Sequence, residues 1–207
     1  MTPIESLHEK HVKQRRVRVL GELISRFFGD TRATVLDIGC GDGAIAKFLT
    51  AKSTGLSVTG IDTLVRSDTA VTVNSFDGQK IPYGEKSFDY CLFVDVLHHA
   101  EKPLDLLCQS ARIARRGVII KDHYLKGLFA KTTLRFMDNA HNRRYGVSLP
   151  YRYWTQEQWA EALSIVGLQA QHTVTRLGLY PPWADWFFGR GLHFLSLLRP
   201  CGTTDST

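Results

Sequence analysis

A glycine-rich loop near the start of the chain has the residue types of a ligand-binding turn. Residues 37–43 read Asp-Ile-Gly-Cys-Gly-Asp-Gly and separate an apolar, β-rich run from a segment with helical periodicity. Glycine lets the backbone turn sharply and approach a ligand without a Cβ atom in the way, and the amino end of the following helix attracts electron-rich groups. We therefore expect Gly39, Cys40 and Gly41 to contact a nucleotide-like cofactor.

The spacing of the glycines admits two classes of cofactor. Residues 39–44 satisfy the G-x-G-x-x-A form of a dinucleotide site, which would imply NAD. Asp37 favours the other class, because a carboxylate two residues before the first glycine repels a pyrophosphate and suits a cofactor that carries an ammonium and a sulfonium. The chain also lacks the Tyr-x-x-x-Lys pattern of many oxidoreductases. The residues therefore favour S-adenosylmethionine over NAD.

Further motifs follow the loop in a regular order. They are two acids near the ends of β-rich runs and three short signatures: Asp62, Asp77, Ile-Pro-Tyr at 81–83, Ser-Phe-Asp-Tyr at 87–90 and Asp-Val-Leu-His-His at 95–99. With the loop, this order resembles the class I S-adenosylmethionine-dependent methyltransferases, and the three signatures are similar to those of the type 11 subgroup. The resemblance covers 34–120 and does not reach the acceptor site.

The resemblance implies roles for the two acids. It assigns Asp62 to the ribose hydroxyls of the cofactor and Asp77 to its adenine amino group. Thr63, Phe76 and Asp95 complete the set of residues that we expect to bind the cofactor.

Plainer interpretations of these residues stay open. Asp37 could cap a helix or form a turn, and Asp62 could be an acid of a surface loop. Asp77 precedes a glycine, and Asp-Gly is a common turn dipeptide. For His98 and His99 we expect packing or a local hydrogen bond rather than a role in proton transfer.

Three residues after the fifth predicted strand are candidates for catalysis. The sulfonium already makes the methyl group electrophilic, so a base is optional, but a hydroxyl acceptor could lose its proton to a histidine or carboxylate. His123 is the first candidate, followed by Asp122 and His141. The alternative is that Asp122 and His123 only tie down their loop.

Residues 122–154 interrupt the α/β pattern with polar, aromatic and basic side chains. We expect this insertion to form a lid that holds a small organic acceptor. Arg143, Arg144 and Arg152 could pair with a carboxylate or phosphate, which makes an acidic acceptor a candidate. The alternative is an ordinary surface loop.

Aromatic residues gather again at 183–188, after an irregular turn at 181–183. Trp183, Trp186, Phe187 and Phe188 could form a patch for a membrane or a partner. We expect instead a hydrophobic connector packed under the last strands.

Alternating strands and helices must position all of these residues. The pattern predicts strands over 33–38, 57–62, 70–74, 88–94 and 117–121, and helices over 4–28, 44–51, 63–69 (short), 103–111 and 155–167. Two closing strands, over 168–176 and 192–198, suggest an antiparallel pair. The elements predict an α/β fold with a doubly wound, Rossmann-like, mostly parallel seven-stranded sheet, an antiparallel C-terminal strand and helices on both faces. Such sheets bind ligands outside the carboxyl ends of their strands.

Length and composition predict one domain over 1–207, with a helical cover over 1–30 and a flexible tail over 200–207. No secretory signal pattern or bilayer-spanning apolar run is present, so we expect a cytoplasmic protein without a membrane partner. The four cysteines are scattered and lack zinc-ligand spacing, so we expect free thiols and no metal.

Together these features predict an S-adenosylmethionine-dependent methyltransferase that transfers a methyl group to a small organic acceptor by in-line displacement. A net charge of +6 with basic clusters at 10–18 and 112–116 keeps an RNA-directed, tRNA-type enzyme of the same fold as an alternative. It is less favoured, because neither a separate RNA-binding domain nor an Asn-Pro-Pro-Tyr motif is apparent. A catalytically silent binding module is a further alternative. The sequence indicates no oligomeric state.

Overall fold

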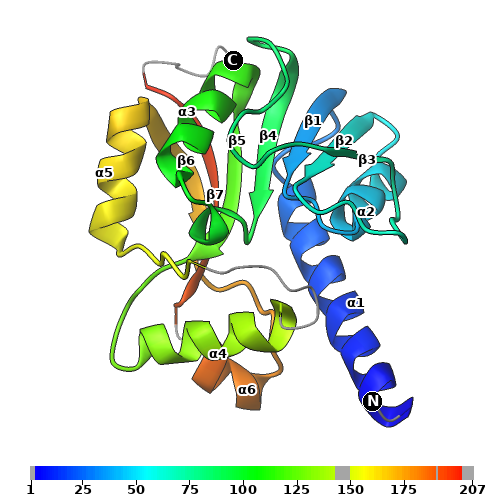
Figure 1. Ribbon diagram of the computed structural model, residues 1–207, viewed down its shortest axis with the longest axis vertical. Helices are drawn as coiled ribbons and strands as arrows, with labels where there is room; N and C mark the ends of the chain where they lie inside the picture. The colour runs from blue at the N-terminus through cyan, green and yellow to red at the C-terminus, as the bar shows by residue number, and fades with distance from the viewer. Residues whose placement is uncertain (1–2, 143–149, 190, 202–207) are drawn as a thin grey trace.

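A twisted seven-stranded sheet forms the centre of the molecule (Figure 1). The computed structural model describes residues 3–142, 150–189 and 191–201. Across the sheet the strands follow the order β3-β2-β1-β4-β5-β7-β6. Their bounds are β1 (Ala33–Ile38), β2 (Leu56–Asp62), β3 (Val73–Ser75), β4 (Phe88–Val94), β5 (Ala114–His123), β6 (Leu168–Val174) and β7 (His193–Pro200).

The strands β3, β2, β1, β4 and β5 are parallel to one another, whereas β7 is antiparallel to both of its neighbours, β5 and β6. The chain order reverses between β1 and β4, so a crevice forms outside the carboxyl ends of these two strands. The predicted fold class is confirmed.

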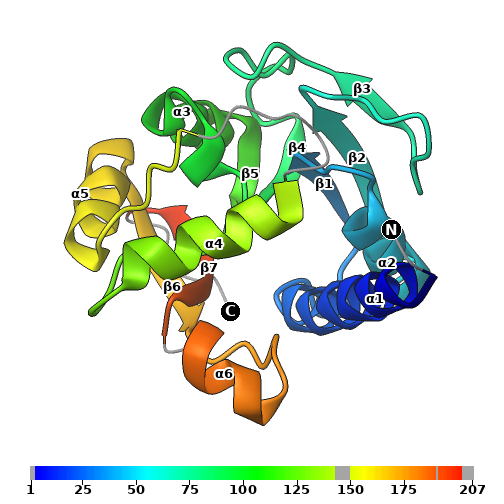
Figure 2. The same cartoon turned by 60° about the horizontal axis from the view of Figure 1, so that its bottom comes forward.

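Helices cover both faces of the sheet and its carboxyl edge. Their bounds are α1 (Pro3–Ser25), α2 (Ala44–Lys52), the 3₁₀ turn η1 (Leu97–His99), α3 (Pro103–Ile113), α4 (Ala130–Asn142), α5 (Gln156–Val166) and α6 (Pro182–Phe188). Figures 1 and 2 show α4 and α6 beyond the carboxyl ends of the parallel strands. No helix in the described ranges is long and apolar enough to cross a bilayer.

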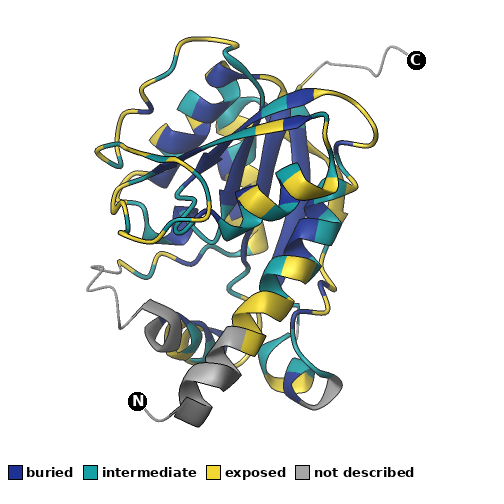
Figure 3. Ribbon diagram, turned by 90° about the vertical axis from the view of Figure 1, so that its right-hand side faces the viewer, coloured by how far each residue is buried: buried dark blue, intermediate teal, exposed yellow. Residues whose placement is uncertain are grey.

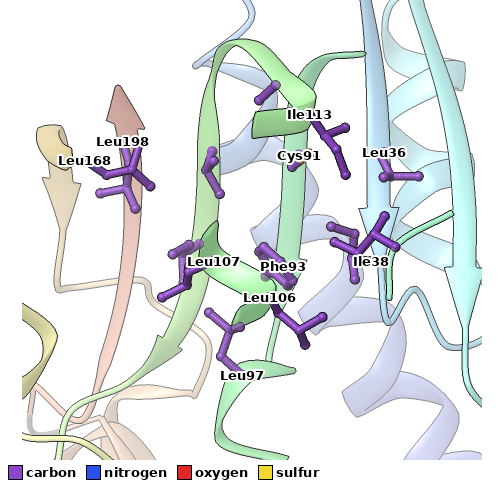
Figure 4. Packing of buried hydrophobic residues seen from close by; sticks show 14 of the residues in the cluster. Leu36, Ile38, Cys91, Phe93, Leu97, Leu106, Leu107, Ile113, Leu168 and Leu198 are labelled. Carbon is purple, nitrogen blue, oxygen red and sulfur yellow. The ribbon is translucent and has the colours of Figure 1, made fainter. Parts of the chain in front are cut away.

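Alternate residues of each central strand enter two different cores, because successive side chains of a strand point to opposite faces. On one face Ile38 and Phe93 pack with Leu106 of α3 (Figure 4). On the other face Val35 and Leu92 pack with side chains of α1 and α2. Burial on both faces explains why the strand sequences are nearly continuous apolar runs.

Only the second half of α1 belongs to the core. Leu20 and Ile24 are fully buried against the sheet, whereas residues 11–15 are exposed (Figure 3). The helix therefore extends past the carboxyl edge of the sheet, where Lys13 pairs with Asp42 of the glycine loop. The predicted helical cover thus reaches the site as well as the core.

Several segments differ from the prediction. The connection at 63–69 is irregular rather than helical: an Asp62 oxygen accepts from the Leu64 amide at 2.9 Å, and the Ala70 amide is held by the Asp42 carbonyl at 2.7 Å. Residues 122–154 contain α4, whose buried Ala130 and Leu134 have helical spacing that the polar composition concealed.

The predicted turn at 181–183 instead begins α6, in which a proline occupies the first helical turn. At the carboxyl end, β7 extends to Pro200, and the Cys201 amide donates to the Gly167 carbonyl at 2.8 Å. These two residues of the predicted tail are therefore tied to the sheet, and 202–207 lie outside the described residues.

The start of α5 offers a test of the local rules. Thr155 and Gln158 form a reciprocal capping box: the Gln158 amide donates to Thr155 Oγ1 at 3.3 Å, and the Thr155 amide donates to Gln158 Oε1 at 2.9 Å. We predict that Thr155→Ala lowers the free energy of unfolding by about 1 kcal/mol, because the cap is lost. Thr155→Ser, which keeps the oxygen, should unfold in urea like the parent. Equal stability of the alanine variant would contradict this assignment.

Candidate active site

The glycine loop forms a tight cradle between β1 and α2. Gly39 and Gly41 have φ of 72° and 61°, in the left-handed region that favours glycine. A Cβ atom on Gly39 would lie 2.6 Å from a Val96 methyl carbon, so the backbone there has no room for a side chain. The Gly39 amide donates to the Ile61 carbonyl at 2.8 Å and thereby ties the loop to the end of β2.

Asp62 lies against this loop at the end of β2. One of its carboxylate oxygens accepts from the Gly41 amide at 2.7 Å, and the other accepts from the Leu64 amide at 2.9 Å. The side chain is only half-buried and stands at the carboxyl end of β2. It therefore shapes the cradle and remains open to a ligand on its outer side.

Asp37 is the least satisfied group of the cradle. It is buried at the end of β1, and its Oδ1 is among the buried oxygens without a hydrogen-bond partner in the described part of the chain. Burial, and then the nearby negative charge of Asp62, raise the pKa of the Asp37 carboxyl to about 7. A cationic ligand in the cradle would relieve both effects. The site thus fits the amino group of S-adenosylmethionine better than a pyrophosphate.

Three more of the expected cofactor residues lie next to β2 and β3. Asp77 is exposed and accepts from the amides of Gln79 and Lys80 at 2.8 and 2.7 Å, which lower the pKa of its carboxyl. This geometry matches the turn-forming interpretation of Asp77. Phe76 is half-buried and packs against the core, and Thr63 is exposed next to Asp62.

Asp95 begins a second polar group at the end of β4. Its φ of 57° is strained for a residue with a side chain, and such strain is common at functional sites. Its carboxylate accepts from Lys121 of β5 and from Arg16 of α1. Although burial opposes it, these two cations hold the pKa of Asp95 well below its usual range. Sequence reasoning missed both cations, because only the parallel pairing of β4 with β5 and the course of α1 bring them here.

Two histidines share Asp122 at the end of β5. His98 Nδ1 donates to Asp122 Oδ1 at 2.6 Å, and His98 Nε2 lies 3.5 Å from Asp138 of α4. His123 Nδ1 lies 3.3 Å from the same Asp122 oxygen, and its Nε2 lies 3.6 Å from Asp95. The structure therefore brings His123 and Asp122 together with His98, for which we expected only packing or a local bond.

The two histidines have opposite charge states. Burial opposes a charged His98, but the carboxylates of Asp122 and Asp138 outweigh it and raise the pKa of His98 to about 10. Burial and the positive charge of Lys121 lower the pKa of His123 below its ordinary value. At neutral pH the cluster holds a charged His98 and a neutral His123 that can accept a proton.

Residues of the insertion and of α5 hold this cluster in place. Trp159 Nε1 donates to the His123 carbonyl at 3.0 Å, and the Tyr153 hydroxyl donates to Asp138. Arg152 donates to the Glu101 carbonyl at 2.7 Å, so it holds a loop. His141 belongs to α4, but its side chain, together with Arg143 and Arg144, lies outside the described residues.

His98, Asp122 and His123 also have the donor types of a metal site, with ligand atoms within 4.8 Å of one another. The spacing of these residues in the sequence did not indicate such a cluster. Asp122 Oδ1 already accepts from the His123 amide at 2.8 Å besides the two rings. Among the described residues these contacts form an ion-pair network, in which Asp122 Oδ2 accepts no hydrogen bond.

A cavity of about 580 Å³ is lined by residues 175–180, which follow β6, by α6 and by the first residue of β7. Its lining includes Arg176, Tyr180, Trp186 and His193. The His193 ring lies 4.9 Å from the His123 ring, and its Nδ1 lies 3.3 Å from Lys121 Nζ. The cavity thus borders the histidine cluster, and sequence reasoning missed it because its walls come from an irregular segment.

A family model described as a methyltransferase domain matches residues 11–173. The chain belongs to this methyltransferase family. Ubiquinone biosynthesis O-methyltransferase of Rickettsia bellii is 29% identical to the methyltransferase over 134 residues, which cover 56% of this chain and 55% of that protein. The methyltransferase thus spans about half the length of this curated relative.

Solved structures share the fold of the methyltransferase. A chain in a complex of the Haloferax volcanii Trm112 methyltransferase activator has a TM-score of 0.67 and 15% identity, with 94% of each chain covered. The Burkholderia thailandensis 1,6-didemethyltoxoflavin-N1-methyltransferase, solved with S-adenosylhomocysteine, has a TM-score of 0.63 and 19% identity, with 96% of this chain and 85% of that chain covered. The family match and the shared fold together assign the chain a methyltransferase domain.

The raised pKa of Asp37 predicts pH-dependent cofactor binding. A bound ammonium stabilises the carboxylate, so S-adenosylhomocysteine should bind up to about tenfold more tightly at pH 8 than at pH 6, with proton release near pH 7. Asp37→Asn should weaken binding and remove this dependence on pH. Asp105→Asn, which changes an exposed side chain of α3, should behave like the parent. Calorimetry in two buffers of different ionisation enthalpy measures both quantities. Binding by the parent that does not depend on pH would contradict the role of Asp37.

Proposed function

We propose that this methyltransferase transfers a methyl group to a hydroxyl of a small organic acceptor, with His123 as the general base. The observation that carries the proposal is the position of His123, whose Nδ1 lies 3.3 Å from Asp122 at the carboxyl edge where β4 and β5 end. Burial and the charge of Lys121 lower the pKa of His123, which favours its neutral form. A neutral imidazole oriented by a carboxylate is a common arrangement for removing a proton from oxygen. Nitrogen acceptors that are uncharged have less need of such a base.

Residues at the ends of β1 and β2 would hold the cofactor. Bound S-adenosylmethionine supplies a methyl group that is already electrophilic. The cofactor would lie against the backbone at Gly39 and Gly41, with Asp37 paired to its amino group and the Asp62 carboxylate at its ribose. Asp77, Thr63, Phe76, Cys40 and Asp95 belong to the same proposed cofactor-binding set.

The histidine cluster would manage the acceptor proton. Asp122 accepts from His123 Nδ1, which leaves the lone pair on Nε2 for the acceptor hydroxyl. Charged His98 keeps Asp122 ionised, although burial opposes this, and so maintains the His123 tautomer. Asp122 and His98 are positioning residues in this scheme, and His123 is the catalytic residue.

The cavity beside His193 is the proposed acceptor pocket. It offers the aromatic side chains of Tyr180 and Trp186 and the guanidinium group of Arg176. This lining suits a ring or apolar body with an acidic substituent. Arg176 joins Arg143, Arg144 and Arg152 as a proposed partner for an acidic acceptor.

The printed name of the curated relative, a ubiquinone biosynthesis O-methyltransferase, supports an oxygen acceptor. Methyl transfer from labelled S-adenosylmethionine to phenols, hydroxylated benzoates, amines and total tRNA tests the acceptor class directly. We expect label in the hydroxylated aromatic compounds. Label confined to tRNA would favour the RNA-directed alternative, and label confined to the amines would remove the need for His123.

With an active acceptor, His123→Ala should lower kcat/KM by about 10² to 10⁴, since a positioned general base contributes that much. The affinity for S-adenosylhomocysteine should not change. Because the His123 pKa is lowered, the parent should keep a flat kcat/KM from pH 8 down to the ordinary histidine range and lose activity only below it. His172→Ala on exposed β6 is the matched histidine control. Parent-like turnover by His123→Ala would refute the catalytic role.

A further inference from the structure

Large apolar side chains are exposed on α4, on the two residues before it and on α6. Leu128 and Trp186 have 83% and 71% of their surface exposed, and Phe129, Phe136 and Phe187 are also mostly exposed. The Phe136 and Phe188 rings, 6.5 Å apart, join the two helices, which lie together at the lower end of the molecule in Figure 1. We call residues 126–136 and 186–187 the α4–α6 surface. The expectation of a connector packed under the last strands is wrong for Trp186 and Phe187.

The charges around these apolar side chains are mostly positive. Lys126, Lys131 and Arg135 are exposed within the α4–α6 surface. The nearby described acids are Asp138, which is buried in the histidine cluster, Asp185, which is half-buried, and Glu157, which is exposed near Lys126. Exposed aromatic residues mixed with lysine and arginine suit the boundary between lipid headgroups and acyl chains.

The backbone at the start of α4 presents this surface at a cost. Phe129 has a φ of 62°, which is strained for a residue with a Cβ atom, yet most of its ring faces solvent. Its carbonyl accepts from the Thr133 amide at 2.9 Å and so begins the helix. Without a covering partner, an exposed phenylalanine at a strained position has no stabilising role.

We propose that the α4–α6 surface docks the protein on an anionic phospholipid bilayer. The positive charge complements acidic headgroups, and the aromatic side chains enter the acyl boundary. A second copy fits less well, because two such surfaces facing each other would bring like charges together. The protein lies on the membrane in this proposal and does not cross it.

The position of the surface suggests what docking serves. Trp186 belongs both to the α4–α6 surface and to the lining of the 580 Å³ cavity. An acceptor with an apolar chain could therefore reach the cavity from the lipid. This consequence rests on the proposed function, whereas docking itself does not.

Vesicle sedimentation tests the proposal. The full chain should sediment with vesicles that contain phosphatidylglycerol, bind pure phosphatidylcholine much more weakly, and dissociate in high salt. Leu128→Ser/Phe136→Ser should bind at least about tenfold more weakly, because two exposed apolar side chains lose their burial. Lys126→Ala and Lys131→Ala should each cost about fivefold. Ile165→Ser, which removes an exposed apolar side chain of α5, is the matched control.

Binding of S-adenosylhomocysteine by every variant shows that the fold is intact and separates this test from the proposed function. Absence of the parent from anionic vesicles at low salt would overturn the proposal, as would an equal loss in Ile165→Ser. Self-association that Leu128→Ser/Phe136→Ser abolishes, without vesicle binding, would assign the surface to a second copy instead.

Discussion

The ion pairs of Asp95 with Lys121 and Arg16 are the interaction on which the site depends. The middle of β4 and the middle of β5 are apolar and buried, and Lys121 and Asp122 are almost fully buried where β5 ends. A buried charge is tolerated when it is paired, and removing one partner leaves the other uncompensated. The same pairs join β4, β5 and α1, so the cofactor crevice and the amino-terminal helix are held by one network.

That network also sets the histidine charges. Asp122 and Asp138 hold a proton on His98, whereas Lys121 disfavours one on His123, although the two rings lie only 4.7 Å apart. Neighbouring groups with pKa values driven apart are the usual basis of acid and base roles in one site. Asp37 shows the same principle at the end of β1, where burial raises its pKa in advance of a cationic ligand. The carboxyl edge thus has one group suited to a cationic ligand, Asp37, and one base, His123.

Sequence reasoning predicted what depends on local pattern. Residues adjacent in the sequence were enough to predict the apolar strands, the glycine turn at 39 and 41 and the acid at 62. The order of these features predicted the fold class. Side chains that meet only through strand pairing or helix packing could not be predicted, and Arg16, Lys121 and His193 are of this kind. The helices α4 and α6 were missed because exposed aromatic and basic residues mask a narrow buried stripe.

The charge states of His98 and His123 are tested most directly by long-range ¹H–¹⁵N correlation spectroscopy of their ring nitrogens from about pH 6 to about pH 8. His98 should stay doubly protonated across this range, and His123 should be neutral from about pH 7 upward, with its proton on Nδ1. Assignment by His98→Asn and His123→Asn separates the two signals. A neutral His98 together with a charged His123 at pH 7 would contradict the account, because the base would then be absent from the carboxyl edge.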